Sequence, residues 1–130
     1  FPFALINACF FTSKYEIQII DDLPNNSPQL EIHCASRDND LEHHFLNPNQ
    51  DFTWSFCMQV FRKTLFFCHF WWGSKNQIFD VFNNQHHCVD MGTVPIGTKK
   101  CVWIVKSDGI YLGFYQKDGY IHKNHYSDWN

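Results

Sequence analysis

Two short runs contain the residue types that bind transition metals: His86-His87-Cys88 and His43-His44. A zinc site needs three or four such ligands converging on the ion at about 2.0 to 2.3 Å. In an extended strand, however, neighbouring side chains point to opposite faces of the sheet. No two cysteines have the C-x-x-C spacing of common zinc sites. The pattern therefore predicts surface histidines with a structural role, no metal ion and no other cofactor.

Side chains able to catalyse hydrolysis are also present, but not in patterns that are specific for an enzyme. Cys68 and His69 are a formal nucleophile and base, yet as neighbours in a strand they lie on opposite faces. Asp21-Asp22, and Asp38 with Asp40, could act as paired carboxylates or bind calcium. They stand in turn sequences, where Asp commonly caps its own backbone. The G-x-S-x-G, P-loop and H-E-x-x-H motifs are absent, so we predict that the chain is not an enzyme.

Six cysteines in a chain of 130 residues form a disulfide framework if the protein is exported, or scattered thiols if it stays in the cytosol. The opening sequence FPFALINACFF has no initiator Met and resembles the apolar tail of a signal segment or the start of a processed chain. These features favour a secreted, extracellular protein with disulfide bonds. Asn25-Asn26-Ser27 predicts a glycan acceptor at Asn25, although Pro28 follows directly.

The composition indicates one folded domain that is rich in β-structure. Hydrophobic residues make up 45% of the chain and aromatic residues 18%, while alanine, the best helix former, occurs only at Ala4, Ala8 and Ala35. The net charge of -3 leaves no basic surface for a phosphate backbone, so nucleic acid is excluded as a partner. The uncharged stretch 1–13 is shorter than the roughly 20 apolar residues that a transmembrane helix needs.

Runs of four to eight β-prone residues recur between turn sequences, a pattern typical of a β-sandwich or barrel with about eight strands. The expected strands are residues 15–20, 30–35, 41–46, 52–57, 65–72, 77–82, 100–107 and 110–116. The turn sequences between them are residues 22–28, 36–40, 47–51 and 107–109. The longest loop is 83–99, and loops of this length are often functional.

Alternation along these strands assigns side chains to the core or to the surface. In the fourth expected strand the core set is Phe52, Trp54 and Phe56, and Cys57 points outward. In the fifth, both alternating sets are apolar or aromatic, so this strand is predicted to be central or covered on both faces. The same pattern places three cysteines on the core side: Cys34, Cys68 and Cys101.

Several strand sequences follow one another in a specific order. They are Ile32-His33-Cys34, the run 36–41, Leu46-Asn47-Pro48, the runs 52–56, 64–72, 79–82 and 101–104, and Asp108-Gly109. This ordered set, from about Tyr15 to Trp129, resembles the plant self-incompatibility proteins, also called S-protein homologues. The resemblance implies an all-β fold: an extracellular antiparallel β-sandwich of two sheets, held by disulfides and made with a signal peptide. Some members of that family are pistil-secreted ligands that arrest incompatible pollen, and most have no assigned role.

The resemblance also implies domain limits and a disulfide pairing. Residues 15–130 are predicted to form the self-incompatibility-protein-like domain, and residues 1–14 a signal-peptide remnant or extension outside the match. The inward-facing Cys34 and Cys101 match the family's cysteine positions and are expected to form a bridge. Cys68 would then pair with Cys88, with Cys9 as the rival partner. Many relatives have a cysteine near the C-terminus, whereas residues 120–129 contain none, and Cys9 and Cys57 are additions to the pattern.

These expectations favour a monomeric signalling ligand that a cell-surface receptor recognises, in pollen rejection or in development. Because the strands are committed to the core, recognition is predicted to lie in the polar loops. The residues expected there are Asn25, Asn26, Arg37, Asp38, Asn39, Asp40, Asn49, His86 and His87. The alternatives are a secreted enzyme or defence protein that acts on cell walls or microbes, and a small-molecule carrier. A pocket with convergent polar groups and perturbed titratable residues would favour either alternative, whereas a tightly filled sandwich with a polar loop surface would favour the ligand.

Overall fold

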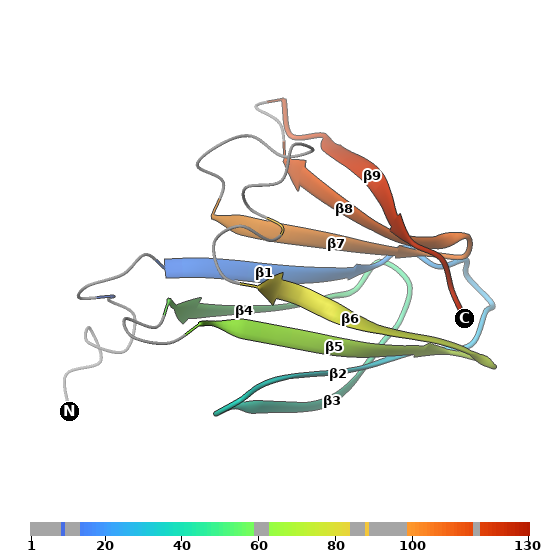
Figure 1. The fold of residues 1–130 in the computed structure, drawn as a ribbon. Helices are drawn as coiled ribbons and strands as arrows, with labels where there is room; N and C mark the ends of the chain where they lie inside the picture. Colours follow the sequence, from blue (N-terminus) through green and yellow to red (C-terminus); the bar gives the residue numbers. More distant parts are fainter. Residues whose placement is uncertain (1–8, 10–13, 59–62, 84–87, 89–98, 116–117) are drawn as a thin grey trace.

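Nine β-strands and no helix make up the described part of the computed structural model, which comprises residues 9, 14–58, 63–83, 88, 99–115 and 118–130. The strands are β1 (Lys14–Asp21), β2 (Leu30–Ser36), β3 (Asp40–Leu46), β4 (Asp51–Cys57), β5 (Leu65–Trp72), β6 (Lys75–Asn83), β7 (Lys100–Lys106), β8 (Gly109–Tyr115) and β9 (Ile121–Ser127). They form two sheets that pack face to face (Figure 1). The predicted all-β sandwich is therefore confirmed. Within these residues, a search for an apolar helix of membrane-spanning length finds none.

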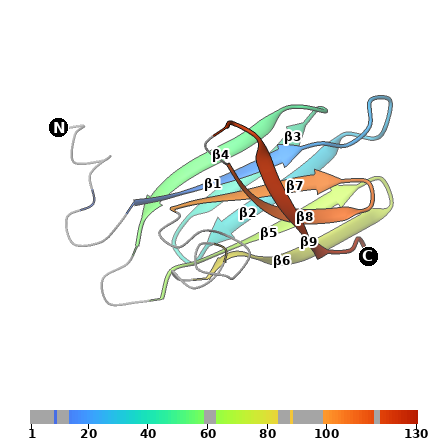
Figure 2. The ribbon, with the colours of Figure 1, turned by 90° about the horizontal axis from the view of Figure 1, so that it is seen from above.

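The five-stranded sheet has the order β4-β1-β7-β8-β9, and the four-stranded sheet has the order β3-β2-β5-β6. Seen from above, the twisted five-stranded sheet lies over the other sheet (Figure 2). All neighbouring strands are antiparallel except β1 and β7, which run in the same direction. The expected antiparallel arrangement thus holds for every pair but this one. Between β1 and β7 the chain forms β4 of the same sheet and all four strands of the other sheet.

The strand that the sequence analysis missed is β9. Its residues IHKNHYS are mostly polar and exposed, so they lack the alternating apolar pattern on which strand prediction depends. It forms an edge of the five-stranded sheet through antiparallel pairing with β8. Tyr126 anchors it to the core, where the centroid of its ring lies 4.8 Å from that of Trp103 and 5.0 Å from that of Phe79.

The core lies between the sheets and follows the predicted alternation. Trp103 of β7 is fully buried, and its Nε1 donates a hydrogen bond to the carbonyl of Val81 at 3.1 Å. The outward orientation of Cys57 is confirmed, since its side chain is exposed and those of the alternating aromatic residues of β4 pack against the core. β5 is an interior strand of its sheet, and the residues on its outward face are half-buried. The largest fully buried side chains are Trp103, Phe70, Phe82, Ile17 and Ile19.

The disulfide pairing differs from the predicted one. The three bridges are Cys9–Cys57, Cys34–Cys68 and Cys88–Cys101. Both predicted bridges, Cys34–Cys101 and Cys68–Cys88, are therefore wrong, and so is the rival pairing of Cys68 with Cys9. Because Cys68 is oxidised, it cannot act as a nucleophile beside His69.

Strand order explains the observed pairing. Cys34 and Cys68 lie directly opposite each other on the neighbouring strands β2 and β5, with their Cα atoms 4.1 Å apart. Cys101 also faces the core, but it belongs to the other sheet. A cysteine must face the core to form a buried bridge, but this orientation does not determine which cysteine is its partner.

Candidate functional site

The four loops predicted to carry recognition lie at opposite ends of the sandwich. β2 begins after loop 22–28 and ends in turn 36–40, so the length of a strand separates these two segments. Loop 47–51 lies between β3 and β4 at the first end, whereas β6 ends at Asn83 and β7 begins at Lys100 at the second end, so both ends of the longest predicted loop are found there (Figure 1). His86 and His87 of that loop lie outside the described residues. We call the first end the hydrogen-bonded end and the second the disulfide end, after the interactions that hold each.

Loop 22–28 at the hydrogen-bonded end is fastened to the body of the protein. Leu23 is only 5% exposed and belongs to the core. Its N–H donates to Oδ1 of Asp21 at 2.9 Å. The hydroxyl of Ser27 donates to the carbonyl of Pro24 at 2.6 Å and accepts from Nε1 of Trp72 at 3.4 Å. The loop therefore helps to hold the fold, and the side chains of Leu23 and Ser27 are already engaged within the protein.

Two of the predicted recognition residues at this end, Asn26 and Asn49, have a conformational role. Their φ angles are +70° and +73°, in the left-handed region that asparagine tolerates better than most residues. The backbone N–H of Asn49 also donates to the carbonyl of Asp21 at 2.7 Å. The left-handed backbone conformation explains why asparagine occurs at both positions, so no binding partner is needed to explain them. Asn25, the candidate glycan acceptor, is exposed in the same loop.

Further hydrogen bonds join this loop to β7, and β7 to the C-terminal segment. The N–H of Asp22 donates to the carbonyl of Val105 at 2.9 Å. The carboxylate of Asp22 accepts from Nζ of Lys106 at 2.9 Å, and this hydrogen bond is the main reason why the pKa of Lys106 is raised. Nε1 of Trp129 donates to the carbonyl of Lys106 at 2.8 Å. Polar groups at this end are thus largely bonded to one another.

The turn between β2 and β3 forms part of the disulfide end. The N–H of Ser36 donates to the carbonyl of Asn39 at 2.7 Å, and the N–H of Asn39 donates to the hydroxyl of Ser36 at 3.2 Å. These two bonds close the turn and leave the residues between them, Arg37 and Asp38, exposed at its tip. The turn is therefore a fixed support that presents polar side chains to solvent.

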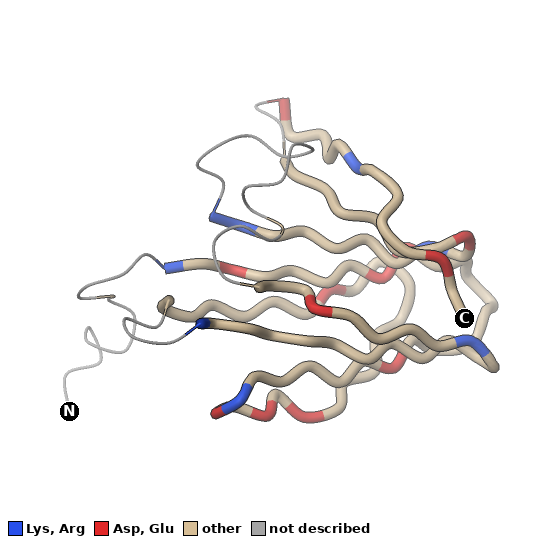
Figure 3. Tube along the Cα trace, viewed as in Figure 1, with Lys and Arg blue, Asp and Glu red and all other residues tan. Residues whose placement is uncertain are grey.

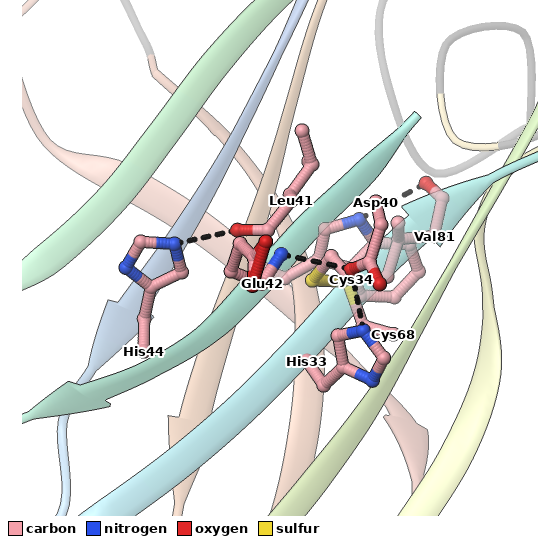
Figure 4. The surroundings of a disulfide bond; sticks show 9 residues. His33, Cys34, Asp40, Leu41, Glu42, His44, Cys68 and Val81 are labelled. Carbon is pink, nitrogen blue, oxygen red and sulfur yellow. Dashed lines mark hydrogen bonds and ion pairs between the residues drawn. A yellow bond between two sulfur atoms is a disulfide. The ribbon is translucent and has the colours of Figure 1, made fainter. Parts of the chain in front are cut away.

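Asp40, the last predicted recognition residue of the turn, is bonded within the protein (Figure 4). Its Oδ1 accepts from the N–H of Glu42 at 2.9 Å and lies 2.7 Å from Nε2 of His33. The bond from Glu42, followed by that from His33, holds the pKa of Asp40 below its ordinary value. On the same strand, Nε2 of His44 lies 2.7 Å from the carbonyl oxygen of Leu41. The side chains of Asp40 and His44 therefore serve the local structure.

Two adjacent hollows open beside the turn. The first has a volume of about 60 Å³ and is lined by residues 36–39, by the end of β4 at Phe56 and Cys57, and by residues 63–66. The second is lined by Ser36, Arg37, Lys63, Leu65 and Phe67. The two share Ser36, Arg37, Lys63 and Leu65, so they meet beside both cationic side chains. Sequence reasoning selected Arg37 but missed Lys63, because only the fold brings the start of β5 next to the turn.

The charges at this site distinguish it from the hydrogen-bonded end. Lys and Arg positions occur at several strand ends on this side of the molecule (Figure 3). Lys100 is paired, with its Nζ 3.1 Å from Oε2 of Glu16. Arg37 and Lys63 are exposed, and within the described residues neither makes an ion pair or a side-chain hydrogen bond. A pair of unneutralised cations beside a hollow is suited to binding an anion.

Sequence reasoning also gave no indication of a row of stacked rings on the outer face of the four-stranded sheet. It consists of His33, His43, Trp71 and His69, with centroid distances of 4.3 Å, 5.6 Å and 3.8 Å between successive rings. His33 lies directly opposite both His43 and His69 in the strand register, and this becomes visible only when the strand order is known. Across the described residues, no group of three or more His, Cys, Asp or Glu is placed to hold a metal ion.

Comparison with known proteins identifies the family of this chain. The sequence profile of the family described as plant self-incompatibility protein S1 matches residues 16–129, from within β1 to beyond β9. S-protein homolog 2 of Arabidopsis thaliana is 35% identical over 103 residues, which are 79% of this chain but only 62% of that relative. S-protein homolog 18 of Arabidopsis thaliana is 30% identical over 107 residues, 82% of this chain and 75% of the relative. Self-incompatibility protein S1 of Papaver rhoeas is 29% identical over 122 residues, 88% of this chain and 84% of the relative. The chain therefore belongs to the plant self-incompatibility protein S1 family.

Proposed function

We propose that the protein is a secreted signalling ligand, and that a cell-surface receptor protein recognises the disulfide end of its sandwich. Three disulfide bonds support secretion, because such bonds persist in oxidising compartments outside the cytosol. Membership of a family that includes a self-incompatibility protein supports a role in signalling between cells. A rigid β-sandwich is also a suitable scaffold for presenting recognition loops.

The observation that carries the proposal is the different state of the polar groups at the two ends. At the hydrogen-bonded end, Asp22, Ser27 and Lys106 already have partners within the protein. At the disulfide end, Arg37 stands on a turn closed by its own backbone, with its side chain exposed. A partner gains most from polar groups that it does not have to detach from existing hydrogen bonds. The receptor contact is accordingly assigned to turn 36–39 and its neighbour Lys63.

An exchange of the turn tip tests this function. Arg37 and Asp38 are replaced by Gly and Ser, and the matched control is Asn25→Ser at the opposite end. Purified, oxidised and fluorescently labelled protein is then added to plant protoplasts, and bound fluorescence is measured beside thermal stability. We expect the tip exchange to reduce saturable binding at least tenfold while the control binds normally. Unchanged binding of the tip exchange, or equal loss in both variants, would contradict the proposal.

The remaining parts of the proposal concern the form in which the ligand acts. Residues 15–130 are the receptor-binding domain, the active species is a monomer, and Asn25 carries a glycan. Because Asn25 lies in loop 22–28, a glycan there would leave the disulfide end accessible. Light scattering of the secreted protein tests the monomer, and a mass shift on enzymatic removal of N-glycans tests Asn25. An Asn25→Gln variant is expected to bind protoplasts as well as the unchanged protein does.

A further inference from the structure

We propose that the hollows beside Arg37 and Lys63 bind an acidic side chain that stands next to an apolar side chain in the partner protein. This inference rests on the proposed function and specifies the chemistry of the contact. It concerns a subsite built from turn 36–39 and the start of β5, where two hollows meet along the same cationic side chains. Each feature of that subsite selects for one property of the ligand.

The first feature is the set of donors around the hollows. Arg37 and Lys63 line both of them and have no ion-pair partner within the described residues. The hydroxyl of Ser36 accepts a hydrogen bond from Asn39, and within the described residues its own hydrogen has no acceptor. A guanidinium fork, an ammonium group and a hydroxyl are the donors that a carboxylate accepts. The donor set therefore selects an anion.

The second feature is the apolar floor. Leu65 and Phe67 follow alternately along the outward face of β5, and both are half-buried within the second hollow. A fully hydrated anion such as free phosphate would gain nothing from these side chains. An apolar side chain beside the carboxylate would cover them and remove their remaining surface from water. The site thus fits an acidic residue with a large apolar neighbour.

The third feature limits the charge of the ligand. Asp38, which directly follows Arg37 in turn 36–39, also lines the first hollow. The lining of that hollow therefore contains two cationic side chains and one carboxylate, a balance that suits one acidic group better than closely spaced negative charges such as those of a polyphosphate or a nucleic acid backbone. We therefore assign the site to acidic and apolar residues of a protein surface.

The direct test uses two short peptides and the whole oxidised chain. Acetyl-Phe-Glu-Leu-amide and its neutral match, acetyl-Phe-Gln-Leu-amide, are titrated while backbone amide signals are followed by NMR. We expect saturable shifts at residues 36–39 and 65–67, with the Glu peptide binding about three- to tenfold more tightly, as two exposed ion pairs would give. High salt should reduce this preference. Equal affinity of the two peptides, or the absence of shifts at these residues, would overturn the inference.

Matched variants separate this inference from the proposed function. Arg37→Gln combined with Lys63→Gln should abolish the preference for the Glu peptide, whereas Lys123→Gln, an exposed lysine on β9, should retain it. The same double variant should lose binding to protoplasts. If it loses the peptide preference but binds protoplasts normally, the subsite is not the partner contact and the inference is wrong. If the turn-tip exchange abolishes protoplast binding and neither peptide binds, the proposed function stands and only the inference fails.

Discussion

The two ends of the sandwich are held together by different means. At the disulfide end, Cys9–Cys57 and Cys88–Cys101 fix the strand ends, and Cys34–Cys68 lies between this end and the middle of its sheet. The hydrogen-bonded end contains no cysteine. A covalent bridge fixes the backbone without occupying the hydrogen-bond donors and acceptors of the loops. Polarity alone therefore does not identify a recognition loop, because the polar groups must also be free of partners within the protein.

At the hydrogen-bonded end, the backbone is fixed by hydrogen bonds that the polar groups make with one another. Here the C-terminal segment folds back onto the β5–β6 hairpin. The centroid of the Trp129 indole lies 5.9 Å from that of Trp72, and the N–H of Asn130 donates to the carbonyl of Asn76 at 3.0 Å. Nε2 of Gln77 donates to the carbonyl of Asp128 at 2.9 Å. Substitutions at this end should therefore act mainly on stability, and substitutions at the tip of turn 36–39 mainly on binding.

The largest effect is expected from removing the bridge between Cys34 and Cys68. Replacing both by Ala releases a loop with a sequence separation of 34, which should lower the free energy of unfolding by about 4 kcal/mol in the chain-entropy model. Urea unfolding measures this loss. Amide hydrogen exchange should accelerate more in turn 36–39 than in loop 22–28. Equal acceleration in both segments would contradict the division between the two ends.

Leu23→Ala at the hydrogen-bonded end should have the next largest effect. Leu23 belongs to a loop but packs in the core, so the substitution is expected to lower the free energy of unfolding by about 2 to 4 kcal/mol through cavity formation. Asn25→Ala in the same loop is the control, with an expected change within about 0.5 kcal/mol because its side chain is exposed. Urea unfolding of both variants tests this prediction. Similar small changes in the two would mean that the loop is free to vary after all.

The properties that could be predicted from the sequence are those set by neighbouring residues. Eight of the nine strands overlap the expected ranges, because their apolar residues alternate or run continuously. The inward aromatic residues of β4 were predicted correctly for the same reason. β9 was missed because its exposed edge position leaves its polar residues without a pattern. Local periodicity therefore reports burial, and a strand that buries little gives a weak signal.

Properties that depend on strand order could not be predicted. The partner of Cys34 is fixed by the pairing of β2 with β5, which no local pattern reveals. The separation of the four loops into two groups likewise follows from the direction of each strand. Lys63 joined the candidate site only because the start of β5 lies beside turn 36–39. Arg37 was found because it stands within a recognisable turn sequence.

A substitution at Asn49 tests whether loop 47–51 has a conformational role or a role in recognition. Asn49 has a φ of +73°, and a β-branched residue is strained in that region, so Asn49→Val should lower the free energy of unfolding by about 1 to 2 kcal/mol. Asn49→Gly should cost less than half of this, because glycine adopts the conformation readily. Binding to protoplasts should be normal for both variants. If the Gly variant folds well but loses binding, then Asn49 is a recognition residue and the hydrogen-bonded end contributes to the contact.

The smallest expected effect concerns a buried carboxyl group at the hydrogen-bonded end. Asp21 is 1% exposed, and burial raises its pKa above the ordinary value, although the hydrogen bond from the N–H of Leu23 acts in the opposite direction. The charge of Asp22 contributes to the increase. Because the folded state disfavours the ionised form, the stability of the protein should fall as pH rises from the ordinary aspartate pKa through the raised one.

Asp21→Asn should remove this dependence, because the amide cannot ionise and its oxygen can still accept from Leu23. The difference in stability should therefore move in favour of the variant as pH rises from the ordinary aspartate pKa through the raised one, and the Tm of the variant should rise relative to that of the unchanged protein. The lowered pKa of Asp40 has the opposite pH dependence, but it is present in both proteins and cancels in the difference. Thermal unfolding across this pH range measures the effect. A variant that becomes less stable relative to the unchanged protein as pH rises would show that Asp21 is stabilised as an anion. Charge, together with neutral hydrogen bonds, would then hold this end of the sandwich.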